Sequence, residues 1–486
     1  MRPPPPAATT GQEVTPVQSF RTEHDLLGDL EVPADVYYGV HTARALLNFP
    51  ISGMPISRHP DLVVALASVK QAAAEANRQL GQLDSTIAGA IITACTEIRD
   101  GALREQFVVD QIQGGAGTST NMNANEVIAN RACELLGHQR GSYDVVHPLE
   151  HVNLGQSTND VYPTALKIAL GTATRTLEQA LRRLADHCST KSLEFADMLK
   201  LGRTQLQDAV PMTLGQEFGA FAVTILEDAD RLGEVSALIA EINLGGTAIG
   251  TGLNTHPEYA ALVCDHLRAV TGLPLTTAGN LVEATSDVGA FVQLSGVAKR
   301  SAVKLSKICN DLRLLSSGPR AGFGEINLPP VQAGSSIMPG KVNPVIPEVV
   351  NQVAFEVIGN DLTVTMAAEA GQLQLNAFEP IIARALLSSI NHLAAAVNVL
   401  RERCIEGITA NTDHMRDAVL RSASLATALN PVLGYEAATA LVAEAIATGE
   451  SIPEMVLRCA LVDEAVLARV LSPENLCGLS GSERAR

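Results

Sequence analysis

Residues 347–369 read PEVVNQVAFEVIGNDLTVTMAAE, a stretch that is apolar on nearly every side when it is wound as an α-helix. Such a pattern predicts a helix that is buried all round. A bundle that contains helices of this kind often completes itself by oligomerisation. The stretch therefore predicts a mostly α-helical protein that is built on a helical bundle and assembled as a homo-oligomer.

Long helical patterns lie on both sides of this stretch. In residues 211–243 apolar residues recur mostly at three- and four-residue steps, with Pro211 at the expected helix start. At 1.5 Å per residue this helix is about 50 Å long, which is too long for a compact globule and suits a bundle. Further helical patterns cover residues 60–80, 85–105, 164–200, 286–316 and 378–406.

The length of 486 residues exceeds what one hydrophobic core supports, so roughly three domains are expected. Breaks in the pattern predict a disordered Pro-rich arm and three domains: 1–20 for the arm, 21–158 for the N-terminal domain, 159–413 for the central bundle and 414–486 for a small C-terminal helical domain. The arm lacks an apolar core and is not a secretory signal. The cytoplasm is therefore the expected compartment.

Charge and cysteine usage exclude several classes of function. The formal charge of −17 argues against nucleic acid or an anionic membrane as a partner. The 8 cysteines are scattered without a CxxC pair, so neither a metal cluster nor a disulfide framework is expected. No cofactor is predicted, and activation by a divalent cation cannot be read from the sequence.

Residues 334–344 read GSSIMPGKVNP and interrupt the helical pattern with glycines and prolines. Gly334 and Gly340 are expected to adopt backbone angles that are closed to other residues. Two adjacent hydroxyls, a lysine and an asparagine within one mobile loop indicate a catalytic lid. The alternative is a Ser/Gly-rich connector with a solvated lysine.

Three more polar segments stand at expected helix ends: GAGTST before a helix from about Ala124, QSTND at 156–160, and RTQ at 203–205. Each could simply cap a helix, since Ser, Thr and Asn do so routinely. Together they supply hydroxyl and amide donors without a phosphate-binding P-loop. Such donors, with one lysine, indicate a site that grips small carboxylates.

The loop at 334–344 resembles the signature loop of the aspartase/fumarase superfamily, and GAGTSTNMNANE, QSTND and GRTQLQDAVP resemble its other blocks. The N-terminal RTEHDLLGDLEVPADVYYGVHTARA is similar to the ammonia-lyase branch of that superfamily. The resemblance spans residues 20–475. It implies a three-domain, mostly α subunit whose long central bundle is completed by tetramerisation, with each active site built from three subunits.

The reaction that the resemblance implies is the anti elimination of ammonia from L-aspartate to give fumarate through an aci-carboxylate intermediate. The resemblance makes Ser335 the general base. The substrate-binding residues that it implies are Thr118, Ser157, Thr158 and Ser336 for the carboxylate that becomes the aci form, Lys341 and Asn343 for the α-carboxylate, and Asn159, Thr204 and Gln205 near the amine. A serine is a poor base unless it is already an oxyanion, which requires Lys341, backbone N–H groups and exclusion of water.

Two other functions compete with this one. Fumarate hydratases of the superfamily carry His where Gln205 stands, paired with a glutamate whose counterpart is Glu348. An amide cannot relay a proton as imidazole does, so Gln205 favours release of an amine over hydration. A non-catalytic scaffold, such as the lens crystallins related to argininosuccinate lyase, is disfavoured because Ser335, Lys341 and Asn343 are intact.

Overall fold

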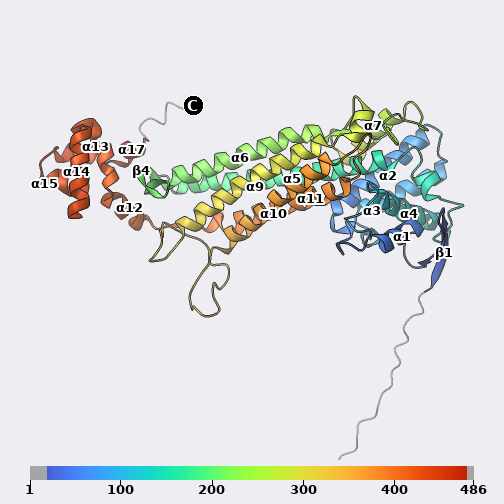
Figure 1. Ribbon diagram of the computed structural model, residues 1–486, viewed down its shortest axis with the longest axis horizontal. Helices are drawn as coiled ribbons and strands as arrows, with labels where there is room; N and C mark the ends of the chain where they lie inside the picture. Colours follow the sequence, from blue (N-terminus) through green and yellow to red (C-terminus); the bar gives the residue numbers. More distant parts are fainter. Residues whose placement is uncertain (1–18, 479–486) are drawn as a thin grey trace, which may run out of the picture. The chain divides into compact units, whose positions relative to one another are not determined.

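The computed structural model describes residues 19–478, and over these residues the chain is mostly α-helical (Figure 1). The predicted fold class is confirmed in this respect. The helices are α1 Val40–Asn48, α2 Pro60–Gln79, α3 Ser85–Arg99, α4 Thr118–Leu135, α5 Thr158–Glu194, α6 Leu214–Ile239, α7 Tyr259–Thr271, α8 Leu281–Ser286, α9 Gly289–Leu315, α10 Val345–Glu369, α11 Glu379–Arg403, α12 Thr412–Arg421, α13 Ala426–Leu433, α14 Tyr435–Thr448, α15 Ile452–Arg458, α16 Glu464–Val470 and α17 Pro473–Leu476.

The strands of the described residues pair in twos. Three pairs are antiparallel and the pair of β5 and β6 is parallel. The strands are β1 Phe20–Asp25, β2 Gly28–Pro33, β3 Leu199–Thr204, β4 Gln207–Thr213, β5 Glu241–Ile242, β6 Thr276–Thr277, β7 Ile326–Asn327 and β8 Thr409–Ala410.

Contacts within the chain define two compact units. Their segments are Met1–Ala169, Ala240–Asp287 and Ala370–Arg384 for the first unit, and Leu170–Ile239, Val288–Glu369 and Ala385–Arg486 for the second. The predicted arm, residues 1–20, lies outside the described residues except for Ser19 and Phe20. The three domains proposed from the sequence stay a prediction.

In the first unit, a buried carboxylate on α4 holds the start of α1. Glu126 accepts hydrogen bonds from the backbone N–H groups of Gly39 at 2.8 Å, His41 at 2.8 Å and Thr42 at 3.1 Å. These N–H groups have no partners within the helix, so the carboxylate satisfies them. Burial raises the pKa of Glu126 to about 7. The contact ties the N-terminal segment to the helix that carries Thr118.

In the second unit, the long helices α6, α9 and α10 run side by side, with α9 packed against both of the others (Figure 1). The apolar steps predicted for α6 are buried from Leu214 to Val235. The helix itself begins after Pro211, which lies in strand β4 instead of at the helix start. The expected helix start at Pro211 is wrong, because residues 199–213 fold back as a β-hairpin.

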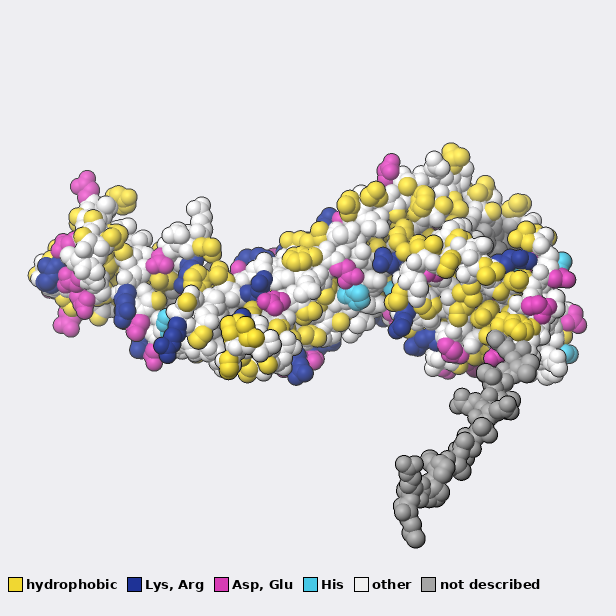
Figure 2. Space-filling view, turned by 60° about the horizontal axis from the view of Figure 1, so that its bottom comes forward, with side chains coloured by type: hydrophobic (Ala, Val, Ile, Leu, Met, Phe, Trp, Pro, Cys, Tyr) yellow, Lys and Arg dark blue, Asp and Glu magenta, His cyan; other side chains and the backbone are white. Residues whose placement is uncertain are grey.

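Helix α10 is not buried all round within one chain. Its inner face, which includes Val350, Ala354 and Val357, is buried. The opposite face exposes a stripe of large apolar residues, in which the exposed fractions are 63% for Phe355 and 61% for Leu362. Figure 2 shows hydrophobic side chains exposed on the surface of the long helices.

Helix α11 is the one candidate for a membrane span among the described residues. The span Glu379–Gly407 is long and apolar enough by length and composition, but 67% of its most apolar window is buried inside the structure. Burial of that extent is typical of a core helix.

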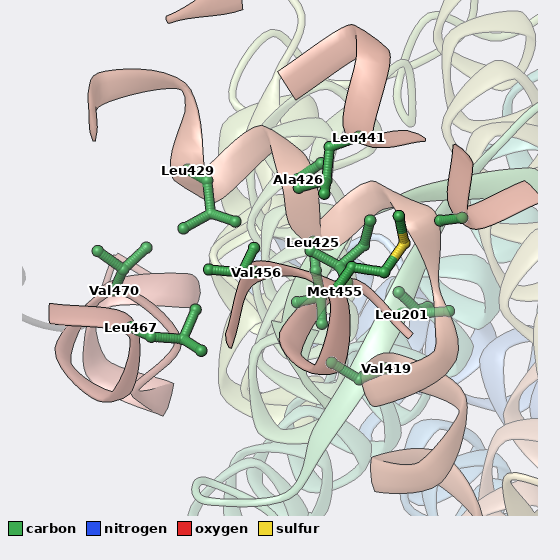
Figure 3. Packing of buried hydrophobic residues seen from close by; sticks show 12 residues of the cluster. Leu201, Val419, Leu425, Ala426, Leu429, Leu441, Met455, Val456, Leu467 and Val470 are labelled. Carbon is green, nitrogen blue, oxygen red and sulfur yellow. The ribbon is translucent and has the colours of Figure 1, made fainter. Parts of the chain in front are cut away.

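The C-terminal helices of the second unit enclose a separate hydrophobic cluster (Figure 3). Met455 and Val456 of α15 lie at its centre, with exposed fractions of 0%. Leu201 of strand β3 is part of the same cluster. The cluster therefore holds strand β3 of the β3–β4 hairpin, whose tip carries two of the predicted site residues, Thr204 and Gln205.

Candidate functional site

The serine loop, residues 334–344, is closed by hydrogen bonds between its two ends. The Gly334 N–H donates to the Lys341 carbonyl at 2.8 Å, and the Asn343 side chain donates to the Gly334 carbonyl at 2.6 Å. A Cβ on residue 334 would lie 2.4 Å from the Lys341 carbonyl oxygen. A glycine is therefore required at position 334 because a side chain would collide with this carbonyl, and not because the backbone angle is unusual. Gly340, by contrast, adopts a left-handed φ of 78°.

The hydroxyl of Ser335 receives two backbone donors from its own loop. Its Oγ accepts hydrogen bonds from the N–H groups of Ile337 at 3.2 Å and Met338 at 3.0 Å. Donors that converge on a hydroxyl oxygen favour its deprotonated form. The neighbouring Ser336 is exposed. The loop thus treats its two serines differently, and only Ser335 has part of the surroundings that an oxyanion needs.

Lys341 and Asn343 line a concave surface of the second unit. The cavity has a volume of about 590 Å³, and Arg313 and Glu348 contribute to its wall. The Arg313 guanidinium and the Glu348 carboxylate are 3.9 Å apart. A lysine, an arginine and an amide in one cavity can bind a small carboxylate.

Thr204 and Gln205 lie at the tip of the β3–β4 hairpin. Gln205 and Leu206 form its two-residue turn, and both adopt left-handed φ angles, of 54° and 62°. Glycine or asparagine is the usual choice for such a turn, so these two residues are strained. Backbone strain of this kind often occurs at functional sites.

A buried ion network anchors this hairpin within the second unit. The Lys200 ammonium contacts Glu217 at 2.6 Å and Glu325 at 2.8 Å, and the Arg203 guanidinium contacts Glu325 at 2.6 Å. Lys200 is 2% exposed and Glu325 is 3% exposed. Since Glu325 precedes the strand β7, which lines the cavity, the network fixes the hairpin relative to the Lys341 cavity.

In the first unit, Thr118 is the first residue of α4 and not a residue upstream of a helix at Ala124 as the sequence suggested. Its hydroxyl donates to the Gly115 carbonyl at 2.8 Å. Gly117 precedes the helix with a φ of 89° and has no side chain to cap it, but the Gln113 side chain accepts the Thr120 N–H at 3.0 Å. The Thr118 N–H donates to the Gly115 carbonyl at 3.0 Å, so these two N–H groups at the start of α4 already have partners.

Ser157, Thr158 and Asn159 form the start of α5. The Ser157 hydroxyl accepts the Asn159 N–H at 3.2 Å, so Ser157 does cap the helix. The Thr158 hydroxyl accepts a hydrogen bond from Asn121 at 3.1 Å, and the Asn159 side chain donates to the Ala248 carbonyl at 2.7 Å. Capping and substrate binding are compatible, because a hydroxyl that accepts a backbone N–H still has its own proton to donate.

The buried carboxylate of Asp160 anchors residues 157–159 through hydrogen bonds to backbone N–H groups. Its carboxylate accepts N–H groups of Ser157 at 2.9 Å, Gly245 at 3.1 Å and Thr247 at 2.8 Å. Burial raises the pKa of Asp160 to about 6, against the opposing effect of these donors and of Lys70. Lys70 is fully buried, and burial lowers its pKa to about 7.

We expect Asp160→Asn to destabilise the protein by about 3 kcal/mol, because its amide group would face backbone donors with a donor of its own. The apparent melting temperature measures the loss, and activity should fall with it. Asp144→Asn is the control, since Asp144 is exposed and a change there should stay within about 0.5 kcal/mol. A melting temperature of Asp160→Asn equal to that of the control variant would contradict the anchoring role.

The predicted site residues divide between the two units. Thr118 and residues 157–159 lie in the first unit, while residues 204–205 and 335–343 lie in the second. The sequence reasoning missed Lys70, Asn121 and Asp160, although a lysine on the apolar face of the predicted helix 60–80 was a readable signal. No group of three or more His, Cys, Asp or Glu side chains that could hold a metal is found in residues 19–478.

Comparison with known families gives two matches. The pattern of a lyase family matches residues 28–359, and that of the C-terminal region of fumarase C matches residues 425–478. The first match includes the long helices α5, α6 and α9, and helix α11 lies between the two matches.

Individual relatives match over nearly the whole chain. An aspartate ammonia-lyase of Pseudomonas aeruginosa is 60% identical over 95% of this chain and 98% of the relative, and one of Escherichia coli K12 is 54% identical over 94% and 96%. A solved structure titled fumarate lyase:delta crystallin, from Brucella melitensis, is 56% identical with a TM-score of 0.91, covering 94% of this chain and 99% of that one. A class II fumarase of Schistosoma mansoni is 35% identical with a TM-score of 0.89, covering 94% and 98%.

Proposed function

The chain belongs to the lyase family of the aspartase/fumarase superfamily, and we propose that it is a carbon–nitrogen lyase that eliminates ammonia from L-aspartate to give fumarate. The observation that carries this proposal is the identity of 53–60% to aspartate ammonia-lyases over 94–95% of the chain. Gln205 supports it as well, because its side chain cannot transfer a proton as a histidine would.

In the proposed mechanism, the oxyanion of Ser335 removes the proton from the carbon next to the side-chain carboxylate of L-aspartate and becomes the neutral hydroxyl. The N–H groups of Ile337 and Met338 already point at the Ser335 hydroxyl, and Lys341 adds a positive charge to the same loop. The extra negative charge of the aci-carboxylate must be met by donors that are in place before the reaction. The ammonium group leaves already protonated and needs little help from an acid.

Each polar segment of the chain is proposed to contact a different group of the substrate. The donors proposed for the aci-carboxylate are Thr118, Ser157, Thr158 and Ser336; Lys341 and Asn343 are proposed to hold the α-carboxylate, and Asn159, Thr204 and Gln205 to face the amine. The cavity lined by Lys341 and Asn343 supports the assignment of the α-carboxylate. We expect no metal or organic cofactor to take part.

A spectrophotometric assay separates this function from its rivals. Fumarate formation is followed by ultraviolet absorbance with L-aspartate and, in parallel, with L-malate. The ammonia-lyase predicts turnover of L-aspartate with little or none of L-malate. Turnover of L-malate alone would identify a fumarate hydratase, and no turnover of either would favour a non-catalytic scaffold.

We propose that the protein works as a homotetramer in the cytoplasm, with each active site assembled from segments of three subunits. The exposed apolar stripe on α10 supports the assembly. It consists of large residues one or two helical turns apart, namely Phe355, Ile358, Leu362 and Met366. A stripe of this kind on a bundle helix suits burial against other copies of the chain.

We expect Phe355→Glu and Leu362→Glu, singly or together, to dissociate the tetramer, because a charge in an apolar interface must be stripped of water. Light scattering after size exclusion measures the molar mass. Leu457→Glu is the matched control, since Leu457 is 46% exposed but lies on α15. The stripe has no role in assembly if both α10 variants keep the molar mass of the wild type.

A further inference from the structure

A buried polar network in the first unit connects helix α2 to the Thr158 hydroxyl. The Lys70 ammonium is 0% exposed and donates to Asn153 Oδ1 at 2.9 Å and to Gln156 Oε1 at 2.8 Å. Asn121 Nδ2 donates to the same Asn153 oxygen at 3.1 Å and to Thr158 Oγ1 at 3.1 Å. The ammonium is therefore two side chains away from a hydroxyl that is proposed to bind substrate.

The chemistry of an ammonium group gives this network a direction. The protonated form of Lys70 can only donate, so the atom of Asn153 that faces the ammonium has to be the carbonyl oxygen. With that oxygen as an acceptor, Asn121 must turn its amino group toward Asn153. The same amino group then reaches Thr158, whose oxygen becomes an acceptor and whose own proton stays available.

This arrangement of donors and acceptors leaves two buried amide oxygens without hydrogen-bond partners. Asn125 Nδ2 also donates to Asn153 Oδ1, at 3.2 Å. Among the described residues, the Oδ1 atoms of Asn121 and Asn125 are buried without a hydrogen-bond partner. A network without a fixed donor at one end could turn an amide over to relieve this. Two contacts remove that freedom, because a turned Asn153 would present its amino group to Lys70 and its oxygen to the Gln156 carbonyl, to which its Nδ2 now donates at 3.2 Å.

We propose that Lys70 is a positioning residue for catalysis: through Asn153 and Asn121 it fixes the Thr158 hydroxyl as a donor toward the substrate carboxylate. The proposal rests on the proposed function, in which Thr158 binds the carboxylate that becomes the aci form. That carboxylate gains negative charge in the transition state, so a correctly directed donor acts mainly on kcat.

The same helix offers a matched control. Asn77 lies two turns after Lys70 on α2, is 4% exposed, and donates to the Leu154 carbonyl at 2.8 Å. Asn77→Leu and Lys70→Met thus both remove a buried donor to the 153–156 turn. Only Lys70→Met removes a donor to the Asn153 oxygen, while the bond from Asn153 Nδ2 to the Gln156 carbonyl stays in both variants.

The test is a double-mutant cycle of Lys70→Met with Thr158→Val, measured as kcat and KM for L-aspartate. We expect Lys70→Met to lower kcat/KM about 10-fold, mainly through kcat, and Asn77→Leu to stay within about 2-fold of the wild type. In the Thr158→Val background, Lys70→Met should have little further effect, because its route to the substrate is already lost. If Lys70→Met does not fold, Lys70→Gln replaces it in the cycle.

Multiplying effects of the two substitutions, or an equal loss in Asn77→Leu, would overturn the proposal and leave Lys70 a purely structural residue. The same four proteins are also compared by their dissociation constants for succinate, measured by calorimetry, because this measurement requires no turnover. An inactive wild type would refute the proposed function, while non-additive binding of the dicarboxylate would still support the role of Lys70. The two failures are therefore distinguishable.

Discussion

Replacing Ser335 with alanine is expected to lower kcat for L-aspartate by roughly 10³-fold, the range in which positioned bases act. The substitution removes the oxygen on which the Ile337 and Met338 N–H groups converge, while the bonds that close the loop do not involve the side chain. KM should change little, because Ser335 is proposed to act on the proton and not to hold the substrate.

Ser336→Ala is the matched comparison, since it removes the adjacent, exposed hydroxyl from the same loop. Its proposed role is donation to a carboxylate, so we expect a loss of roughly 10-fold in kcat/KM. Initial rates over a range of substrate concentrations separate the two parameters. The base assignment is wrong if Ser335→Ala keeps kcat within about 10-fold of the wild type.

Replacing Lys341 with methionine is expected to lower kcat/KM for L-aspartate by roughly 100-fold, because a charged partner of the α-carboxylate is lost. Lys341 lines the cavity of the second unit, and no carboxylate of residues 19–478 pairs with its ammonium there. It is thus available to an anionic substrate. A large part of the loss should appear in KM, since this carboxylate carries the same charge before and during the reaction.

Lys341→Arg is the control because it keeps the charge but changes the geometry of the donors. We expect it to lose less than Lys341→Met, and the difference between the two variants measures the value of the charge. Equal losses would mean that geometry alone matters. Unchanged KM in both variants would remove Lys341 from substrate binding.

The long helices could be predicted because their apolar residues recur at helical steps. Helices α2, α3, α9, α10 and α11 begin within about three residues of the expected positions. The β3–β4 hairpin could not be read in the same way, since its register depends on Leu201 packing into the C-terminal cluster. The exposure of Phe355 could not be predicted either. An apolar pattern shows which side chains avoid water, but not whether they are covered by the same chain or by another copy.

Polar segments of the site were visible in the sequence because hydroxyls, amides and glycines gather in short stretches between helices. Their supports were less visible. Asp160 and Glu325 are buried ionisable residues with partners far away in the sequence, and no local pattern marks those contacts. Lys70 left one signal, its place on the apolar face of the predicted helix 60–80, but its partner Asn153 is also far away in the sequence. The reason for Gly334 was a close contact within its own loop, with the Lys341 carbonyl, which depends on how the loop folds back on itself.

The measurement that tests the account most directly is the stoichiometry of the reaction with L-aspartate. Fumarate is followed by absorbance and ammonia by a coupled assay on the same sample of purified wild-type protein. We predict that the two products appear at equal rates and that Ser335→Ala lowers both rates by the same factor. Fumarate formed from L-malate without any ammonia from L-aspartate would contradict the account.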